Sequence, residues 1–113
     1  MKSVHQKRAE RHEKRTAEEI GGTITPMSGA GSAKGDVANQ RELWECKTTT
    51  AKQWTLRLVD LLKVRQQALV QGKDPVFCIE FAAFPDCEFV VVSKQDYLED
   101  QRDLSQLRGD GQW

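Results

Sequence analysis

Residues 36–49 read DVANQRELWECKTT, and this stretch decides the fold. It predicts two short strands, 36–38 and 42–49, because a polar pair that favours a turn, Asn39-Gln40, lies between two runs of strand-forming residues. The two strands are close enough in the chain to pair as an antiparallel hairpin.

The segments on either side of this hairpin predict helices and further strands. Capping signals, glycines and apolar runs set their boundaries. In chain order we expect a helix over 3–20, an extended piece over 23–25, a small-residue loop over 26–35, a helix from about 50 to 71, strands over 76–81 and 88–92, and a short helix around Tyr97 and Leu98. This order indicates an α/β (α+β) fold in which helices flank a central mixed sheet.

The length of 113 residues leaves room for one domain with one core. Hydrophobic residues make up 38% of the chain, which with 8 glycines lies near the low edge of the range for folded proteins. We assign residues 1–103 to a single domain. Residues 104–113 carry two glycines and little periodicity, so we expect them to form a flexible C-terminal tail.

The chain carries 17 basic and 17 acidic residues, so its total charge indicates no particular partner. Its 3 cysteines lack CxxC spacing and predict neither a disulfide framework nor a zinc site. No apolar run approaches the roughly 18 residues of a membrane span, and the charged N-terminus does not resemble a signal peptide. We therefore expect a cytoplasmic protein that does not enter a membrane.

The helix over 3–20 has one charged residue, Glu13, on the face that we expect to be buried. At about 100° per residue, the other members of that face are Ala9, Thr16, Ala17 and Ile20. The two histidines of this helix, His5 and His12, are expected at the surface and not as a metal-binding pair.

The helix over 50–71 opens with a capping-box pattern from Thr50 to Gln53 and stops at Gly72. Its apolar stripe is predicted to pack in the core. The members of the stripe are Leu58, Leu61, Leu62, Ala68 and Leu69, with Trp54 a turn earlier.

Basic residues gather in the first helix, among them Arg8, Arg11 and Arg15. Such a cluster either contacts the phosphates of a nucleic acid or simply solvates one face of a helix. Both interpretations stay open at this point.

Two carboxylates and a lysine are expected to converge at the hairpin. Side chains two residues apart in a strand point to the same face, so Glu45 and Lys47 lie together, and hairpin pairing brings Asp36 opposite Glu45. Carboxylates this close repel each other unless a cation lies between them. Mg²⁺ meets that need because it prefers oxygen ligands and keeps positions for water and phosphate. Lys47 can then orient or deprotonate an attacking water, or stabilise the transition state.

A loop of small residues precedes Asp36 and allows a DNA backbone to approach closely. Ser28 and Lys34 in this loop are candidates for phosphate contact; the alternative is that they only solvate the loop. Thr48 is a further candidate, and the alternative is that it is an ordinary strand residue. The whole pattern has a plain alternative too, because an acid followed two residues later by a lysine is common on solvent-facing strands.

The segments Lys34-Gly35-Asp36-Val37 and Trp44-Glu45-Cys46-Lys47-Thr48-Thr49 resemble the PD-(D/E)XK nuclease superfamily, in particular its small phage and archaeal Holliday junction resolvases. The similarity extends over most of the chain and includes the loop before Asp36 and the long helix after Lys47. Gly35 stands where many members have proline, a change that still permits the sharp turn.

The resemblance implies a restriction-endonuclease-like αβββαβ core. It also implies that Asp36, Glu45 and the backbone carbonyl of Cys46 hold Mg²⁺ or Mn²⁺, and that Lys47 is the catalytic lysine. Glu13 matches the glutamate that such resolvases carry on their first helix, and it is expected as an additional metal ligand.

The expected activity is that of a structure-selective endonuclease, a Holliday junction resolvase that cuts branched DNA in a bacterial or phage-infected cell. Resolution needs two cuts at related positions, so the expected assembly is a two-fold symmetric homodimer. Two alternatives stay open, namely a nicking or repair-type nuclease of the same fold and a non-catalytic DNA-binding module.

Overall fold

The computed structural model describes residues 1–25 and 36–108 of the chain. Its elements follow one another as α1 (Val4–Ile20), β1 (Thr23–Ile24), β2 (Val37–Ala38), β3 (Glu42–Thr49), α2 (Leu58–Val70), β4 (Asp74–Phe81), β5 (Glu88–Val91) and α3 (Lys94–Arg108). The first six elements have the order αβββαβ, which agrees with the predicted fold class, and one strand and one helix follow them.

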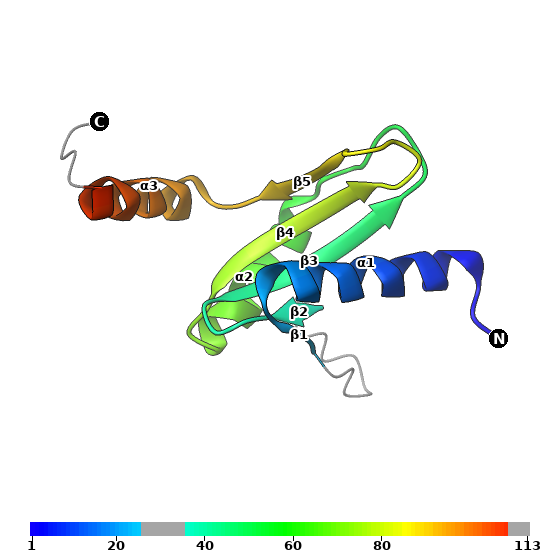
Figure 1. The fold of residues 1–113 in the computed structure, drawn as a ribbon, viewed down its shortest axis with the longest axis horizontal. Helices are drawn as coiled ribbons and strands as arrows, with labels where there is room; N and C mark the ends of the chain where they lie inside the picture. Colours follow the sequence, from blue (N-terminus) through cyan, green and yellow to red (C-terminus); the bar gives the residue numbers. More distant parts are fainter. Residues whose placement is uncertain (26–35, 109–113) are drawn as a thin grey trace.

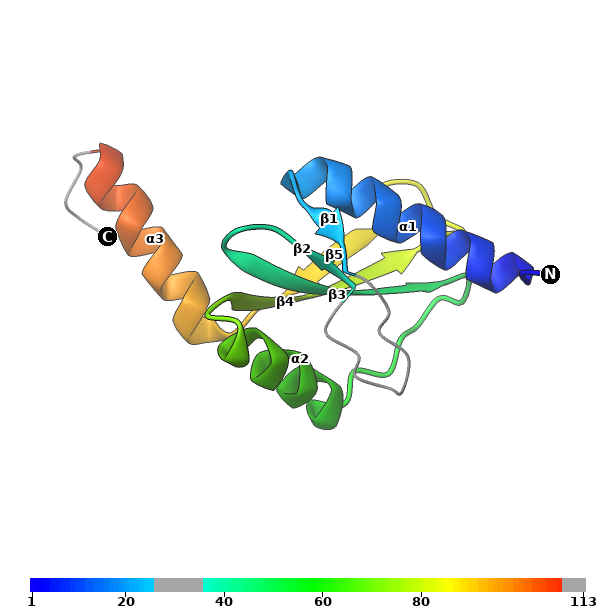
Figure 2. The ribbon, with the colours of Figure 1, turned by 90° about the horizontal axis from the view of Figure 1, so that it is seen from below.

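The five strands form one mixed sheet in the spatial order β1-β2-β3-β4-β5. β3 and β4 run parallel because the chain returns through α2 between them, whereas the other neighbours are antiparallel. α1 covers one face of the sheet and α2 covers the opposite face, as Figures 1 and 2 show. The central pair of strands therefore lies between two helical layers.

Each face of the sheet has its own small core. Under α1 the buried residues are Ala17, Val37 and Cys46, with Trp44 packed against them; under α2 they are Val64, Phe77 and Ile79, with Trp54 packed against them. Alternation along β3 thus separates Trp44 and Cys46 from the face that carries Glu45 and Lys47, as predicted.

α1 begins and ends close to its predicted bounds. Ser3 caps it, since the Ser3 hydroxyl accepts a hydrogen bond from Gln6 N (3.1 Å) and the Gln6 side chain accepts one from Ser3 N (2.8 Å). Gly21 ends the helix with φ of 63°, a left-handed conformation that favours glycine. The prediction for His12 was wrong, because His12 is only 1% exposed and lies between α1 and the sheet.

The predicted start of α2 was also wrong. The helix begins at Leu58, and the position before it, Arg57, makes no side-chain capping hydrogen bond. Near the predicted start, the Thr49 hydroxyl accepts a hydrogen bond from Ala51 N (3.0 Å) and forms a turn. Trp54, within the connecting segment, packs against the core under α2. Tertiary packing therefore overrides the local capping signal.

The apolar stripe of α2 faces the sheet only in part. Ala68 is buried and Leu61 is half-buried, as predicted, but Leu58, Leu62 and Leu69 are 69%, 47% and 71% exposed. The line of contact with the sheet instead includes Val64, which is 3% exposed. An apolar ridge is left on the outer side of the helix.

α3 begins where the sequence predicts, since the Ser93 hydroxyl accepts a hydrogen bond from Asp96 N (3.1 Å). It is longer than expected, because it continues to Arg108. The prediction of a flexible tail is therefore wrong for residues 104–108, which are helical. Figures 1 and 2 show it projecting away from the sheet. Within the described ranges, no helix is long and apolar enough to cross a membrane.

Candidate functional site

Asp36 lies directly before β2, where the hairpin brings it beside β3. Val37 pairs with Trp44, and the same antiparallel register places Asp36 opposite Glu45. Both the main chain and the side chain of Asp36 are held in this position. Its N–H donates to the Trp44 carbonyl (2.8 Å), and its Oδ2 accepts a hydrogen bond from the N–H of Cys46 (2.7 Å). The hairpin register predicted from the sequence is therefore present.

Glu45 and Lys47 point to the side of the sheet that α2 covers. Lys47 Nζ lies 3.3 Å from Glu45 Oε1. Both side chains line a cavity of about 50 Å³ that Asp60 and Lys63 of α2 also line. This volume holds about one or two water molecules. The site thus combines a carboxylate, a lysine and room for water on one face.

Burial raises the pKa of both Asp36 and Glu45 above the ordinary carboxyl values. The negative charge of Asp36 raises the pKa of Glu45 further, whereas Lys47 and Lys63 lower it. The hydrogen bond from Cys46 and the charge of Lys47 lower the pKa of Asp36 without cancelling the effect of burial. Ionising both carboxyl groups is therefore costly unless a further cation is near.

Glu13 lies on α1 and is coupled to the same carboxylates through its charge. Its pKa is raised to about 7, first by burial and then by the negative charges of Asp36, Glu45 and Glu10. Within the described parts of the chain, the carboxylates of Glu13, Asp36 and Glu45 do not form a cluster with all ligand atoms inside 4.8 Å. The three groups are electrostatically coupled.

The donors at this site suit a hard cation. Asp36 and Glu45 offer carboxylate oxygens, and Mg²⁺ or Mn²⁺ prefers such ligands. Only one oxygen of Asp36 is engaged by the Cys46 N–H, so the other can coordinate. Cys46 can contribute its carbonyl but not its thiol, because burial raises the thiol pKa to about 12. The residues present therefore fit a magnesium-type site.

Lys63 and Asp60 belong to this site but were not singled out in the sequence. The sequence leaves Lys63 as a residue that solvates its helix, whereas the structure places it beside Glu45 and Lys47. Its position depends on the rotation of α2 about its axis. No local pattern gives that rotation once the predicted start and stripe of the helix are wrong.

The residues proposed for DNA contact have different outcomes. Ser28 and Lys34 lie outside the described residues. Thr48 is 5% exposed and donates a hydrogen bond to Glu80 Oε1 (2.7 Å) on the α1 side of the sheet. Its hydroxyl is therefore engaged inside the protein, and the structure gives it no surface for a phosphate.

The three arginines of α1 also differ from one another. Arg15 donates to Glu80 Oε2 (2.8 Å) and Glu88 Oε1 (2.9 Å), so its charge is compensated within the fold. The guanidinium of Arg8 lies 2.8 Å from His5 Nδ1. Arg11 is exposed. Arg11 is therefore the arginine whose placement leaves it most open to an external phosphate.

A second cluster, formed by His12, Cys78 and Glu88, lies between α1 and the sheet, with its three ligand atoms within 4.8 Å of one another. His12 Nε2 forms a short hydrogen bond to Glu88 Oε2, and Cys78 Sγ donates to the same oxygen (3.2 Å). Arg15 donates to the other oxygen. Burial alone would raise the pKa of Glu88, but these hydrogen bonds outweigh it and the pKa is lowered.

The hydrogen bonding of this cluster explains it without a metal ion. Both Glu88 oxygens already accept hydrogen bonds from protein donors, and a guanidinium lies where it would repel a cation. A metal-bound histidine normally donates its other ring N–H to a partner, whereas Nδ1 of His12 is buried without one among the described residues. The cluster is therefore a structural hydrogen-bond network.

Comparison with known proteins gave no matching family model and no significantly similar curated protein.

Proposed function

We propose that this chain is a metal-dependent, structure-selective DNA endonuclease that hydrolyses phosphodiester bonds in branched DNA. The observation that supports the proposal most directly is the placement of Asp36 opposite Glu45 with Lys47 on the same face, 3.3 Å from Glu45. Two partly buried carboxylates with raised pKa values, beside a lysine and a small cavity, fit metal-assisted hydrolysis.

In this proposal Asp36, Glu45 and the Cys46 carbonyl hold Mg²⁺ or Mn²⁺, and Glu13 adds a further carboxylate. When bound, the ion supplies an acidified water and offsets negative charge on the phosphate. Backbone pairing of β2 with β3 places Asp36 opposite Glu45, and the Cys46 N–H holds one oxygen of Asp36 against β3.

Lys47 is the proposed catalytic lysine. From its place beside Glu45 it can orient the attacking water, take its proton or stabilise the charge that develops on the phosphate. Lys63 lines the same cavity and adds positive charge on the α2 side.

The proposed substrate is a four-way DNA junction, and the proposed location is the cytoplasm of a bacterial or phage-infected cell. Lys7, Arg11 and Lys14 are exposed and lie within about 60° of one another around α1, so they offer a surface for backbone phosphates. Two symmetric cuts across a junction need a two-fold homodimer.

A cleavage assay on a four-way junction, a flap and a linear duplex tests this proposal. We expect Mg²⁺-dependent cutting that favours the junction, and a loss of about 100-fold or more in Lys47→Ala. Lys73→Ala, in the turn before β4, is the matched control and should keep its activity.

The possible results separate the alternatives. Equal cutting of all three substrates would leave a nicking or repair-type nuclease and remove the resolvase assignment. Weak cutting that is the same in wild type and Lys47→Ala would indicate a contaminant, and together with binding to the junction it would favour a non-catalytic DNA-binding module.

A further inference from the structure

The outer side of α2 carries an apolar ridge that the described parts of its own domain leave exposed. Leu58, Leu62 and Leu69 are 69%, 47% and 71% exposed, and Arg65 lies between the second and third of them. Their spacing of four, three and four residues places all four side chains within about 60° around the helix. This spacing is typical of a helix that packs against another helix.

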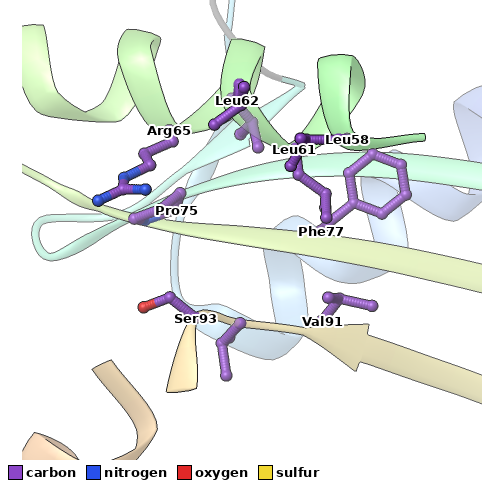
Figure 3. A pocket seen from close by; sticks show the side chains of 10 residues that line it. Leu58, Leu61, Leu62, Arg65, Pro75, Phe77, Val91 and Ser93 are labelled. Atoms are coloured by element: carbon purple, nitrogen blue, oxygen red, sulfur yellow. The ribbon is translucent and has the colours of Figure 1, made fainter. Parts of the chain in front are cut away.

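An apolar groove continues from this ridge to β5. Its volume is about 170 Å³, and its lining includes Leu61, Phe77 and Val91. Figure 3 shows the groove between α2 and the strands β4 and β5, with Ser93, the residue just before α3, at its edge. The chain thus leaves the groove at the point where α3 begins.

α3 carries a stripe of matching character. Tyr97, Leu104 and Leu107 are 52%, 47% and 83% exposed, and they lie within about 80° around the helix. Asp100 falls inside this arc. The spacing is three, four and three residues, so the stripe of α3 resembles the ridge of α2 but carries an acid where the ridge carries a base.

Leu104 and Leu107 line a cavity of about 540 Å³ beside their own domain. Among the described residues, its other walls are polar and include Glu42, Asp74 and Arg41. The pKa of Asp74 is raised by burial and then by the negative charges of Asp96 and Asp100. Asp100 and Asp103 of α3 therefore face Glu42 and Asp74 of their own domain, with Arg41 in the same cavity.

The two unpartnered surfaces complement each other in length and in charge. α3 has 15 residues and α2 has 13, which correspond to about 22 Å and 20 Å. Arg65 has no acidic partner among the described residues, and Asp100 occupies the equivalent central position of the other stripe. α3 therefore has the length and the central acidic residue that a partner helix for the α2 ridge needs.

We infer that two copies of the chain exchange α3, so that each α3 packs along the α2 ridge and groove of the other copy with Asp100 facing Arg65. In such a two-fold assembly, the α2 ridge and the α3 stripe of each copy are both covered by the other copy.

This inference deepens the proposed homodimer but rests on different residues. It depends on the outer surfaces of α2 and α3, whereas the nuclease proposal depends on the hairpin and Lys47. A dimer without cleavage, or cleavage by a monomer, would therefore separate the two.

Light scattering coupled to size-exclusion chromatography of the full chain tests the exchange. Wild type should elute with twice the 12.8 kDa mass of one chain. Arg65→Glu and Asp100→Arg should each weaken dimerisation about 100-fold or more, because each homodimer then contains two like-charged pairs. Arg102→Glu, on the other side of α3, is the matched control and should stay dimeric. Circular dichroism checks that the variants, all at exposed positions, remain folded.

Mixing the two single variants is the decisive measurement. In a mixed dimer the introduced glutamate faces the introduced arginine, and the native Arg65 faces the native Asp100, so the mixture should dimerise although each variant alone does not. A monomeric wild type would overturn the inference and point to another protein or to the same chain as the occupant of the groove. Dimers that persist in both charge-reversed variants would overturn it too, since the interface would then lie elsewhere.

Discussion

The Oδ2 oxygen of Asp36 accepts a hydrogen bond of 2.7 Å from the backbone N–H of Cys46. This contact fixes the aspartate against β3 at the residue that separates Glu45 from Lys47. It leaves the second carboxylate oxygen available for a cation.

Substituting Asp36→Asn should keep this hydrogen bond, since the amide oxygen can accept it, while removing the charge. We expect about 100-fold or more loss of Mg²⁺-dependent cleavage. Differential scanning fluorimetry should also show a smaller rise in melting temperature with added Mg²⁺ than in wild type, because a ligand that binds the folded state stabilises it. Asp103→Asn on α3 is the control, and an unchanged Mg²⁺ response in Asp36→Asn would rule out Asp36 as a ligand.

The pKa of Glu13 predicts a dependence of stability on pH. The folded state holds this pKa at about 7, above the ordinary value of 4.5, so folding favours the protonated form. Stability linked to Glu13 is therefore complete below about pH 4.5 and is lost as pH rises to about 7. In metal-free buffer, Glu13→Gln should be more stable than wild type at pH 8, by about 1 kcal/mol after allowing for solvent screening, and similar to it at pH 4. Urea unfolding at the two pH values measures this difference, and a gain of the same size at both would contradict the assignment.

The stability that the hydrogen-bond network around Glu88 contributes has the opposite dependence on pH. Hydrogen bonds from His12, Cys78 and Arg15 lower the pKa of Glu88, so the stability it contributes is present above its ordinary value of 4.5 and is lost as pH falls through its lower folded-state pKa. Glu88→Gln should lower the free energy of unfolding at pH 7 by about 1 to 3 kcal/mol, because hydrogen bonds to a charged group are lost.

Chemical unfolding between pH 7 and pH 3 checks this prediction. The difference between wild type and Glu88→Gln should shrink as the wild-type carboxyl becomes protonated. Glu99→Gln on α3 serves as the control. In buffer without added Mg²⁺ or Mn²⁺, a chelator should leave the difference in stability between wild type and Glu88→Gln unchanged if the cluster is a hydrogen-bond network, whereas a chelator-dependent change in that difference would indicate a metal ion held by Glu88.

The parts of the fold that the sequence predicts correctly depend on local signals. The cap of α3 at Ser93, the stop of α1 at Gly21 and the turn before β3 are each decided by a few adjacent residues. The shared face of Glu45 and Lys47 follows from strand alternation alone, and the pairing with Asp36 follows from the short hairpin. The centre of the candidate site was predictable for the same reason.

The predictions that were wrong concern features that depend on contacts between distant segments of the chain. His12 is buried between α1 and the sheet, where Glu88 of the distant strand β5 supplies its hydrogen bond, and nothing near His12 in the chain indicates this. The start of α2 depends on the packing of Trp54, and the place of Lys63 depends on how α2 is rotated. An apolar pattern also cannot distinguish a core stripe from a ridge such as that at Leu58, because both have the same spacing.

Lys63 provides the sharpest test of the part of the site that only the structure shows. It lines the cavity with Glu45 and Lys47, and its charge lowers the pKa values of both Asp36 and Glu45. Lys63→Ala should therefore slow cleavage by roughly 10-fold, less than the 100-fold or more that removing a group in direct contact with the reacting atoms produces.

A change at Lys63 should also move the pH profile, because without its charge the two carboxylates ionise at higher pH. The rising limb of cleavage rate against pH should shift upward in Lys63→Ala and return toward the wild-type position in Lys63→Arg, which restores the charge. Lys73→Ala should leave both rate and profile unchanged. If Lys63 only solvated its helix, Lys63→Ala would resemble Lys73→Ala, since an exposed lysine without a role in the site contributes little to either quantity.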